Sequence, residues 1–320
     1  MNEEKLKLIR LADVETQEVS WLWYPYLPKG KVSMIQGDPG EGKTMLALSL
    51  IARLTTGAPL PEQAEGCPPL TVIYQTAEDG LADTIKPRLE KAGADCSRVV
   101  VIDESAGCLS LSDERIEQAI VKTGAQLFVL DPLQAYLGAH VDMHRANEVR
   151  PAFRGLANAA ERTHCAIVAI GHMNKMQGAK GMYRGLGSID IAAICRSILY
   201  VGRSKDDEEK RYMAHLKSSL APVGQSIVFT AGDTLRFIGT SPITAEKLLN
   251  GGGFGGEFAA TKTECAVEAL LRLLGGGEIP CSEVYEYCEE LGISGRTVDK
   301  AKRELGVKSV KRGSRWYWSL

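Results

Sequence analysis

The sequence has no long apolar run and no closely paired cysteines, and these absences narrow its class. No hydrophobic stretch approaches the roughly 18–20 residues that a membrane-spanning helix needs, so we expect no membrane association. The eight cysteines are scattered without a C-x-x-C pair, which is typical of reduced thiols and argues against a zinc site. Residues Met1–Lys5 lack a basic stretch followed by an apolar core, so the sequence predicts no secretory signal and a cytoplasmic location.

A strong net charge is also missing, although the charges are unevenly distributed. The 320 residues carry a formal net charge of −2, and 44% hydrophobic with 24% charged residues is ordinary for a globular protein. The stretch from Arg296 to Leu320 is +6, whereas the remainder of the chain is −8. A basic end on an acidic body indicates a local contact with a polyanion.

Alternating strand and helix patterns from residue 31 to about 200 predict an α/β domain. Short apolar strands between amphipathic helices favour a mostly parallel, doubly wound sheet that is covered on both faces. We expect strands at Lys31–Gln36, Leu70–Thr76, Arg98–Ile102, Gln126–Asp131, His164–Gly171 and Ser197–Gly202, and helices near residues 43–56, 79–93, 113–123 and 145–162. Antiparallel strands that extend the sheet are predicted at Arg211–Lys217, Gln225–Thr230 and Thr234–Ile238.

A glycine-rich stretch separates this region from the end of the chain. Five of the seven residues 250–256 are glycine, a composition that is typical of a flexible linker. The sequence therefore predicts a large domain at 1–245, a linker at 246–258 and a small domain at 259–320.

The sequence GDPGEGKT at residues 37–44 follows a buried-strand pattern and opens a helix. Glycines let the backbone bend so that its N–H groups converge on phosphate oxygens, and the helix N-terminus adds partial positive charge. In this motif the lysine pairs with the β- and γ-phosphates, and the threonine hydroxyl coordinates Mg²⁺. We predict that ATP and Mg²⁺ are bound by Gly37, Asp38, Pro39, Gly40, Glu41, Gly42, Lys43, Thr44 and Met45.

Ligands of a parallel sheet gather at the carboxyl ends of its strands. The polar residues expected there are Glu78, Asp79, Asp131 and His172. Asp131 closes a buried apolar run, as expected of the carboxylate that holds Mg²⁺ with Thr44, although an Asp here also suits a turn cap. We prefer Glu78 to Asp79 as the base that polarises the attacking water, because Asp79 also suits a helix N-cap.

His172 is followed by a basic, glycine-rich loop at residues 173–187. We interpret His172 as a sensor of the γ-phosphate, with a purely structural histidine as the alternative. The loop suits a grip on a nucleic-acid backbone, with an ordinary solvated loop as the alternative. Its DNA-binding candidates are Lys175, Lys180 and Arg184, and a weaker second candidate is the segment Tyr136–Arg145 with His140 and His144.

In combination and in this order, four segments resemble the RecA-like ATPases: Gly37–Thr44, Ala77–Asp79, Leu127–Leu133 and Gly171–His172. Within them the chain is most similar to the RepA-type hexameric replicative helicases of plasmids, phages and mobile elements. The segments Trp21–Gly30 and Gly187–Ser197 also resemble this group, and the likeness covers about residues 15–240.

The resemblance implies a RecA-like core that assembles into a hexameric ring with ATP sites between subunits. It assigns catalytic roles to Glu78, Lys43, His172 and Arg196. It also implies that Arg196, and less directly Arg203 and Lys217, reach a neighbour's site in trans, where an arginine stabilises γ-phosphate charge in the transition state. A surface salt bridge is the alternative for Arg196.

The last segment departs from those helicases, which as a rule lack it. Predicted helices at Thr261–Leu274, Cys281–Leu291 and residues 293–306, followed by a hairpin of Val307–Val310 and Ser314–Ser319, resemble a winged-helix (helix-turn-helix) domain. The third helix would turn Val298, Ala301 and Leu305 inward. The DNA-binding candidates are Arg296, Lys300, Lys302, Arg303, Lys311 and Arg312. A protein-docking or oligomerisation module with a solvated basic face is the alternative.

Four functions are consistent with these features. We expect an ATP-hydrolysing DNA motor, a replicative helicase or helicase-like ATPase that grips single-stranded DNA in its ring. A recombination or repair ATPase is the nearest alternative. An ATP-gated winged-helix DNA-binding regulator belongs to another class. A small-molecule kinase has the least support, because it leaves the basic end of the chain unexplained.

Overall fold

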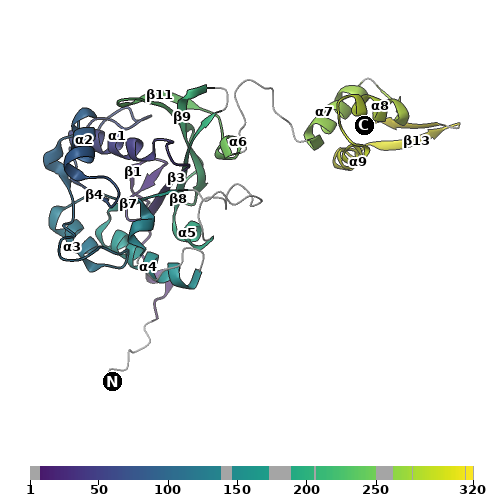
Figure 1. Cartoon of the computed structure of the whole chain (residues 1–320). Coiled ribbons are helices and arrows are strands. Elements are labelled where there is room, and N and C mark those ends of the chain that lie inside the picture. Colours follow the sequence, from purple (N-terminus) through teal and green to yellow (C-terminus); the bar gives the residue numbers. More distant parts are fainter. Residues whose placement is uncertain are drawn as a thin grey trace. The chain divides into compact units, whose positions relative to one another are not determined.

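The computed structural model describes residues 8–137, 146–172, 189–204, 207–249, 262–275, 277–313 and 315–319, and the chain forms two compact units (Figure 1). Unit 1 spans Met1–Gly253 and unit 2 spans Phe254–Leu320. Each unit has a hydrophobic core of its own, which is the physical criterion for a domain.

In the described part of unit 1, a nine-stranded sheet has the strand order β11-β10-β9-β8-β3-β7-β6-β4-β5. The parallel strands are β3 (Val32–Gly37), β4 (Val72–Thr76), β5 (Val99–Val100), β6 (Leu127–Asp131), β7 (Ala166–His172) and β8 (Ser197–Ser204). The antiparallel extension is β9 (Asp207–Ser218), β10 (Ser226–Ala231) and β11 (Leu235–Ser241). The predicted mostly parallel, doubly wound sheet is confirmed.

Helices cover both faces of this sheet (Figure 1). One face packs against α1 (Lys43–Thr56) and α2 (Lys86–Lys91), and the other packs against α3 (Glu114–Thr123), α4 (Ala146–Thr163) and α5 (Ile189–Ile194). A π-helical turn, η2 (Leu81–Ile85), precedes α2 where one helix was predicted over 79–93. The 3₁₀ turns among the described residues of unit 1 are η1 (Leu11–Asp13), η3 (Cys96–Arg98) and η4 (Leu133–Tyr136).

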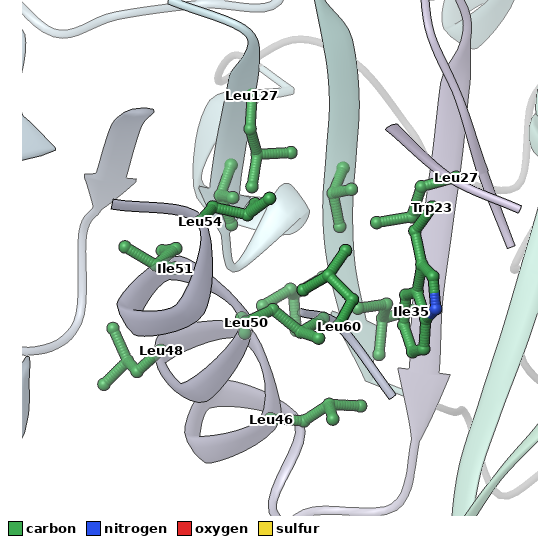
Figure 2. Packing of buried hydrophobic residues seen from close by; sticks show 14 of the residues in the cluster. Trp23, Leu27, Ile35, Leu46, Leu48, Leu50, Ile51, Leu54, Leu60 and Leu127 are labelled. Atoms are coloured by element: carbon green, nitrogen blue, oxygen red, sulfur yellow. The ribbon is translucent and has the colours of Figure 1, made fainter. Parts of the chain in front are cut away.

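Packing of α1 shows why the sheet needs these helices. Leu46, Leu50 and Leu54 recur every four residues, so they share one helix face, and all three are buried. Figure 2 shows Leu50 beside Leu60, on the side of the helix that faces Ile35 of β3. Each such leucine stabilises the fold by roughly 1.5–3 kcal/mol through burial. The packing fixes α1 against β3 and thereby fixes the loop that joins them.

Some small elements were not predicted. A hairpin of β1 (Trp21–Trp23) and β2 (Leu27–Pro28) precedes β3, and the indole Nε1–H of Trp23 donates to the Pro61 carbonyl oxygen at 2.9 Å. A short helix, α6 (Ala245–Leu249), buries Ala245 and Leu248 against strands of the antiparallel extension. The described part of unit 1 therefore extends to residue 249, several residues into the predicted linker.

Unit 2 contains three helices and a small antiparallel sheet in the residues that the structure describes. They are α7 (Lys262–Leu274), β12 (Ile279–Pro280), α8 (Cys281–Glu290), α9 (Gly295–Glu304), β13 (Lys308–Arg312) and β14 (Arg315–Ser319), with the sheet order β12-β14-β13. Val298 and Ala301 are buried, and Leu305 packs against the same core while partly exposed. The elements occur in the order that the sequence predicted, with β12 added.

Candidate active site

The loop at residues 37–44 joins the carboxyl end of β3 to the N-terminus of α1. The local backbone requires glycine at two of its positions. A Cβ atom on Gly37 would lie 2.1 Å from the Val201 carbonyl oxygen of the neighbouring strand β8. Gly42 has a φ of 89°, in the left-handed region that glycine adopts most readily. The backbone of the loop is therefore bent and closely packed, as a phosphate cradle requires.

Lys43 is the first residue of α1, and its side chain turns back into the loop. Its Nζ donates to the carbonyl oxygens of Gly37 and Asp38, both at 2.8 Å, and the residue is buried. Burial lowers the pKa of Lys43, and nearby carboxylates, Asp131 foremost, oppose that shift. The ammonium group thus lies where the loop backbone converges.

Thr44 and Asp131 meet at the carboxyl ends of β3 and β6. Thr44 Oγ1 donates to Asp131 Oδ2 at 2.7 Å, and the same oxygen accepts a 2.8 Å hydrogen bond from the Tyr74 hydroxyl. Asp131 is 8% exposed and Tyr74 is fully buried. The Asp131 carboxylate also contributes to the raised pKa of Tyr74, after burial. Hydroxyl and carboxylate oxygens suit Mg²⁺, which takes few protein ligands and keeps several waters.

Tyr74 was not identified from the sequence. It lies in the continuously buried part of β4, where an aromatic side chain looks like an ordinary core residue. Its contact with Asp131 depends on β4 and β6 being neighbours in the sheet, which a single strand pattern does not specify.

Glu78 and Asp79 follow β4, and their surroundings differ. Glu78 is exposed and close enough to Lys43 to influence its pKa electrostatically. Asp79 accepts a 3.1 Å hydrogen bond from Arg88 of α2, and its N–H donates to the hydroxyl of Thr76. Asp79, one of the two candidates for the base, is therefore paired with Arg88, and this supports the preference for Glu78.

His172 ends β7, directly beside the phosphate loop, since the register pairs it with Gly37. The structure describes the backbone of His172 and not its side chain, so the sensor role stays a prediction. Lys175, Lys180 and Arg184 lie outside the described residues, as do His140 and His144.

Glu41 of the phosphate loop lies between two arginines of the same chain. Its carboxylate accepts hydrogen bonds from Arg203 Nε at 3.0 and 3.2 Å, and Arg211 Nε lies 3.7 Å from Oε2. Arg203 comes from β8 and Arg211 from β9. Strands β8 and β9 thus hold the loop, and Arg203 has a partner within its own chain.

Arg196 and Lys217 lie at the opposite, amino edge of the sheet. The N–H of Arg196 donates to the Val32 carbonyl oxygen at 2.9 Å where β3 begins, and its side chain is exposed. Lys217 Nζ donates to the carbonyl oxygens of Ala192 and Cys195, at 2.6 and 2.9 Å, and so satisfies the C-terminus of α5. Lys217 has a structural task within its own chain, whereas Arg196 points to solvent.

Several basic candidates of unit 2 have partners within that unit, and some are exposed. Lys302 Nζ donates to Ser309 Oγ at 2.6 Å and lies 4.2 Å from the centre of the Trp318 ring. Arg303 Nε donates to the Asp299 carbonyl oxygen, and Arg312 pairs with Glu278 at 2.8 Å. Arg296, Lys300 and Lys311 are exposed, and Lys311 Nζ lies 5.8 Å from the ring centre of Trp316.

The chain has a phosphate loop between β3 and α1, the oxygen pair of Thr44 and Asp131 beside that loop, and a mostly parallel sheet. Together these features define a P-loop ATPase of the RecA-like class. Comparison with known proteins agrees. The family model described as an AAA domain matches residues 2–178, which is more than half of the chain, and the protein belongs to this family.

One curated relative and two solved structures illustrate the likeness. The DNA repair protein RadA of Halalkalibacterium halodurans is 30% identical over 152 residues, which are 47% of this chain and 29% of RadA. The chain therefore spans less than a third of that relative's length. The ATPase domain of G40P superposes with a TM-score of 0.51 at 16% identity, covering 67% of this chain and 86% of that one. The structure of a DnaB-like replicative helicase and its interactions with primase superposes with a TM-score of 0.51 at 16% identity, covering 68% of this chain and 60% of that one. The RecA-like fold is confirmed.

Proposed function

We propose that this protein is an ATP-driven DNA motor of the replicative helicase type, which hydrolyses ATP between the subunits of a homo-oligomeric, hexameric ring around single-stranded DNA. The observation that carries the proposal is that different functional residues lie at the two opposite edges of the sheet. Lys43, Thr44 and Asp131 gather at the carboxyl edge, whereas Arg196 is exposed at the amino edge. An arginine in that position serves a neighbour's nucleotide and not its own.

The chemistry assigned to the chain is hydrolysis of the γ-phosphoryl bond. Phosphate oxygens would compete with the Gly37 and Asp38 carbonyls for the Lys43 ammonium group, which neutralises charge on the β- and γ-phosphates. Thr44 and Asp131 would hold Mg²⁺, which neutralises developing charge when bound. Glu78 would accept a proton from the attacking water, while ADP leaves and the transferred group departs as phosphate.

Unit 2 supports a second DNA contact. The order of its three helices and hairpin supports a winged-helix domain, whose recognition helix would enter a major groove. Arg296 and Lys300 of α9 and Lys311 of the hairpin are exposed. Lysine and arginine side chains in such positions bind phosphate groups and make the affinity dependent on salt.

A recombination or repair ATPase is the second candidate, favoured by the 30% identity with RadA over 152 residues. Both candidates predict ATP turnover that single-stranded DNA stimulates. Only the motor predicts displacement of a strand from a forked duplex.

The proposal is tested by steady-state ATP hydrolysis with and without single-stranded DNA. We expect DNA to raise the rate, Lys43→Ala to abolish turnover, and Glu78→Gln to abolish turnover while ATP still binds. Asp79→Asn is the matched control, because Asp79 is paired with Arg88, and it should retain most of the activity. Robust hydrolysis that no nucleic acid changes would exclude the motor, and loss of activity in Asp79→Asn alone would move the base to Asp79.

A further inference from the structure

Unit 2 exposes a large aromatic side chain on its hairpin. Trp316 of β14 is 49% exposed, whereas Trp318, two residues further along the same strand, is 3% exposed and belongs to the core of the unit. Residues two apart in a strand lie on the same face of a sheet. The hairpin extends past the helices of unit 2 (Figure 1), and Trp316 lies on the half nearer to its turn. The core of the unit therefore takes up one indole and leaves the other in solvent.

Packing explains the buried indole and not the exposed one. The Trp318 ring lies 5.1 Å from the Tyr285 ring in an edge-to-face arrangement, and Lys302 of α9 lies 4.2 Å from the centre of the Trp318 ring. The Trp316 ring has Lys311 opposite it on β13, with Nζ 5.8 Å from the ring centre. An exposed pair of a cation and a ring is weak. About half of the Trp316 side chain thus stays available to a partner.

The charges around Trp316 favour a polyanion as that partner. Residues 308–319 contain no carboxylate and four cations, which are Lys308, Lys311, Arg312 and Arg315. All four are exposed, and Arg312 pairs with Glu278. A nucleic acid presents phosphate groups next to bases, and cations beside an aromatic ring match both. The hairpin therefore suits a nucleic acid.

An indole stacks only on a base whose face is free. Inside a duplex the neighbouring base pairs cover both faces of each base, whereas an unpaired nucleotide can offer one. The hydrogen bond from Lys302 to Ser309, at 2.6 Å, joins α9 to the hairpin. One folded unit can therefore hold a duplex at α9 and an unpaired base at Trp316.

We propose that Trp316 stacks on an unpaired DNA base, so that unit 2 binds the junction between a duplex and a single strand. The inference rests on the proposed function, in which α9 contacts a duplex. Lys311, beside the ring, would bind a neighbouring phosphate group. A junction of this kind arises wherever the motor separates two strands.

The test compares two forked duplexes by fluorescence anisotropy with the full-length chain. One fork carries ordinary unpaired nucleotides at the junction, and the other carries abasic ones, which keep the phosphate groups and lack the bases. Trp316→Ala should weaken binding of the ordinary fork roughly 5- to 100-fold, because the stacking of one base is lost, and should leave binding of the abasic fork unchanged. Trp316→Phe keeps an aromatic ring and should retain most of the affinity.

Leu271→Ala is the matched control. Leu271 lies on α7 and is 46% exposed, so the change also removes an exposed apolar side chain from unit 2. It should alter the binding of neither fork.

Tryptophan fluorescence gives a second readout, because stacking on a base quenches an indole. The ordinary fork should quench part of the fluorescence of the unmodified chain, and the abasic fork should quench less. Trp316→Phe should lose this difference while it still binds the ordinary fork. An indole with only a structural role would give no such difference.

The outcomes separate this inference from the proposed function. Unchanged binding of the ordinary fork by Trp316→Ala would overturn the inference and assign the indole to contact with a protein. Equal losses for the two forks would also overturn it, since the base would then not matter. If Arg296→Glu with Lys311→Glu still weakens duplex binding in either case, the proposed DNA contact of unit 2 stands. Binding of neither fork by the unmodified chain would contradict the proposed function itself.

Discussion

At the residue scale, one carboxylate oxygen of Asp131 accepts hydrogen bonds from both Thr44 and Tyr74. The buried phenol hydroxyl orients a carboxylate that we assign to Mg²⁺. Partners that orient a metal ligand typically contribute 10- to 100-fold to metal affinity. Tyr74→Phe should therefore raise the Mg²⁺ concentration for half-maximal hydrolysis roughly 10-fold, as measured by titrating Mg²⁺ at saturating ATP.

Tyr26→Phe is the control for that change. The Tyr26 hydroxyl donates to the Gln225 carbonyl oxygen at 2.6 Å. Tyr26→Phe therefore removes a phenol hydroxyl, as Tyr74→Phe does, at a position outside the phosphate loop and its ligands. It should lower the free energy of unfolding by about 1 kcal/mol without altering the Mg²⁺ dependence. An unchanged Mg²⁺ dependence in Tyr74→Phe would show that Tyr74 serves only packing.

His215 makes stability depend on pH. It is buried, its Nδ1 accepts from the Gly224 N–H at 3.0 Å, and its Nε2 therefore carries the proton that it shares with Ser197 Oγ at 3.0 Å. Burial lowers the pKa of His215 from 6.5 to about 4. Protonation would add a hydrogen to Nδ1 and break the bond from Gly224.

The direction of the pH effect follows from that pKa. Between pH 6.5 and about 4 the unfolded chain binds a proton at His215 that the folded chain does not. The free energy of unfolding is therefore highest above pH 6.5 and falls as the pH drops through this window, by up to about 3 kcal/mol. His215→Gln should flatten this part of the curve in denaturant titrations. The same slope in the variant would assign the pH dependence to other groups.

At the element scale, the antiparallel strands β8 and β9 hold the phosphate loop through Glu41. Glu41→Gln weakens the contacts to Arg203 and Arg211, which lie on those two strands. Charged hydrogen bonds contribute about 1.5–3 kcal/mol each. Because the loop then loses its support, ATP affinity should fall at least several-fold in equilibrium binding.

Arg203→Ala separates the structural role from the predicted trans role. If Arg203 acts through Glu41, its loss should weaken ATP binding, and the double variant with Glu41→Gln should be no worse than the single ones. If it acts in trans, ATP binding stays normal, hydrolysis falls, and the two effects add. The measured ATP affinity distinguishes these cases.

Sequence periodicity predicted the long elements well. α1 lies at the predicted residues 43–56, because Leu46, Leu50 and Leu54 repeat at helical spacing. The strands of the parallel sheet appeared within about two residues at most ends, since each is an apolar run closed by polar or glycine residues. The convergence of Lys43, Thr44 and Asp131 was also foreseen from the rule that ligands gather at carboxyl strand ends.

Features that depend on tertiary contacts were not predictable. Tyr74 and Arg211 look like ordinary strand residues until neighbouring elements place Asp131 and Glu41 beside them. The hairpin of Trp21–Pro28 is too short for periodicity to identify. Lys302, predicted to bind DNA, and Lys217, predicted to act in trans, have partners in their own chain that lie 7 and 25 residues away.

At the scale of the whole molecule, the basic surface of unit 2 predicts duplex binding. Arg296→Glu and Lys311→Glu together replace two exposed cations on α9 and the hairpin, so they should weaken duplex binding at least ~10-fold and reduce its salt dependence. Arg272→Glu on α7 is the control, because it makes the same change at an exposed position outside that surface.

Hydrolysis should be insensitive to the Arg296 and Lys311 changes, because the phosphate loop and its ligands belong to unit 1. Fluorescence anisotropy with a labelled duplex across a salt series measures the binding. Equal losses in the Arg272 control would indicate a general charge effect and would discredit the winged-helix assignment.

The most direct test of the motor is displacement of a labelled strand from a forked DNA duplex by the full-length chain. We predict displacement that requires ATP and Mg²⁺ and disappears in Glu78→Gln, because strand separation draws its free energy from hydrolysis. DNA-stimulated hydrolysis without displacement of either strand, from forks with a 5′ or a 3′ single-stranded arm, would contradict the account.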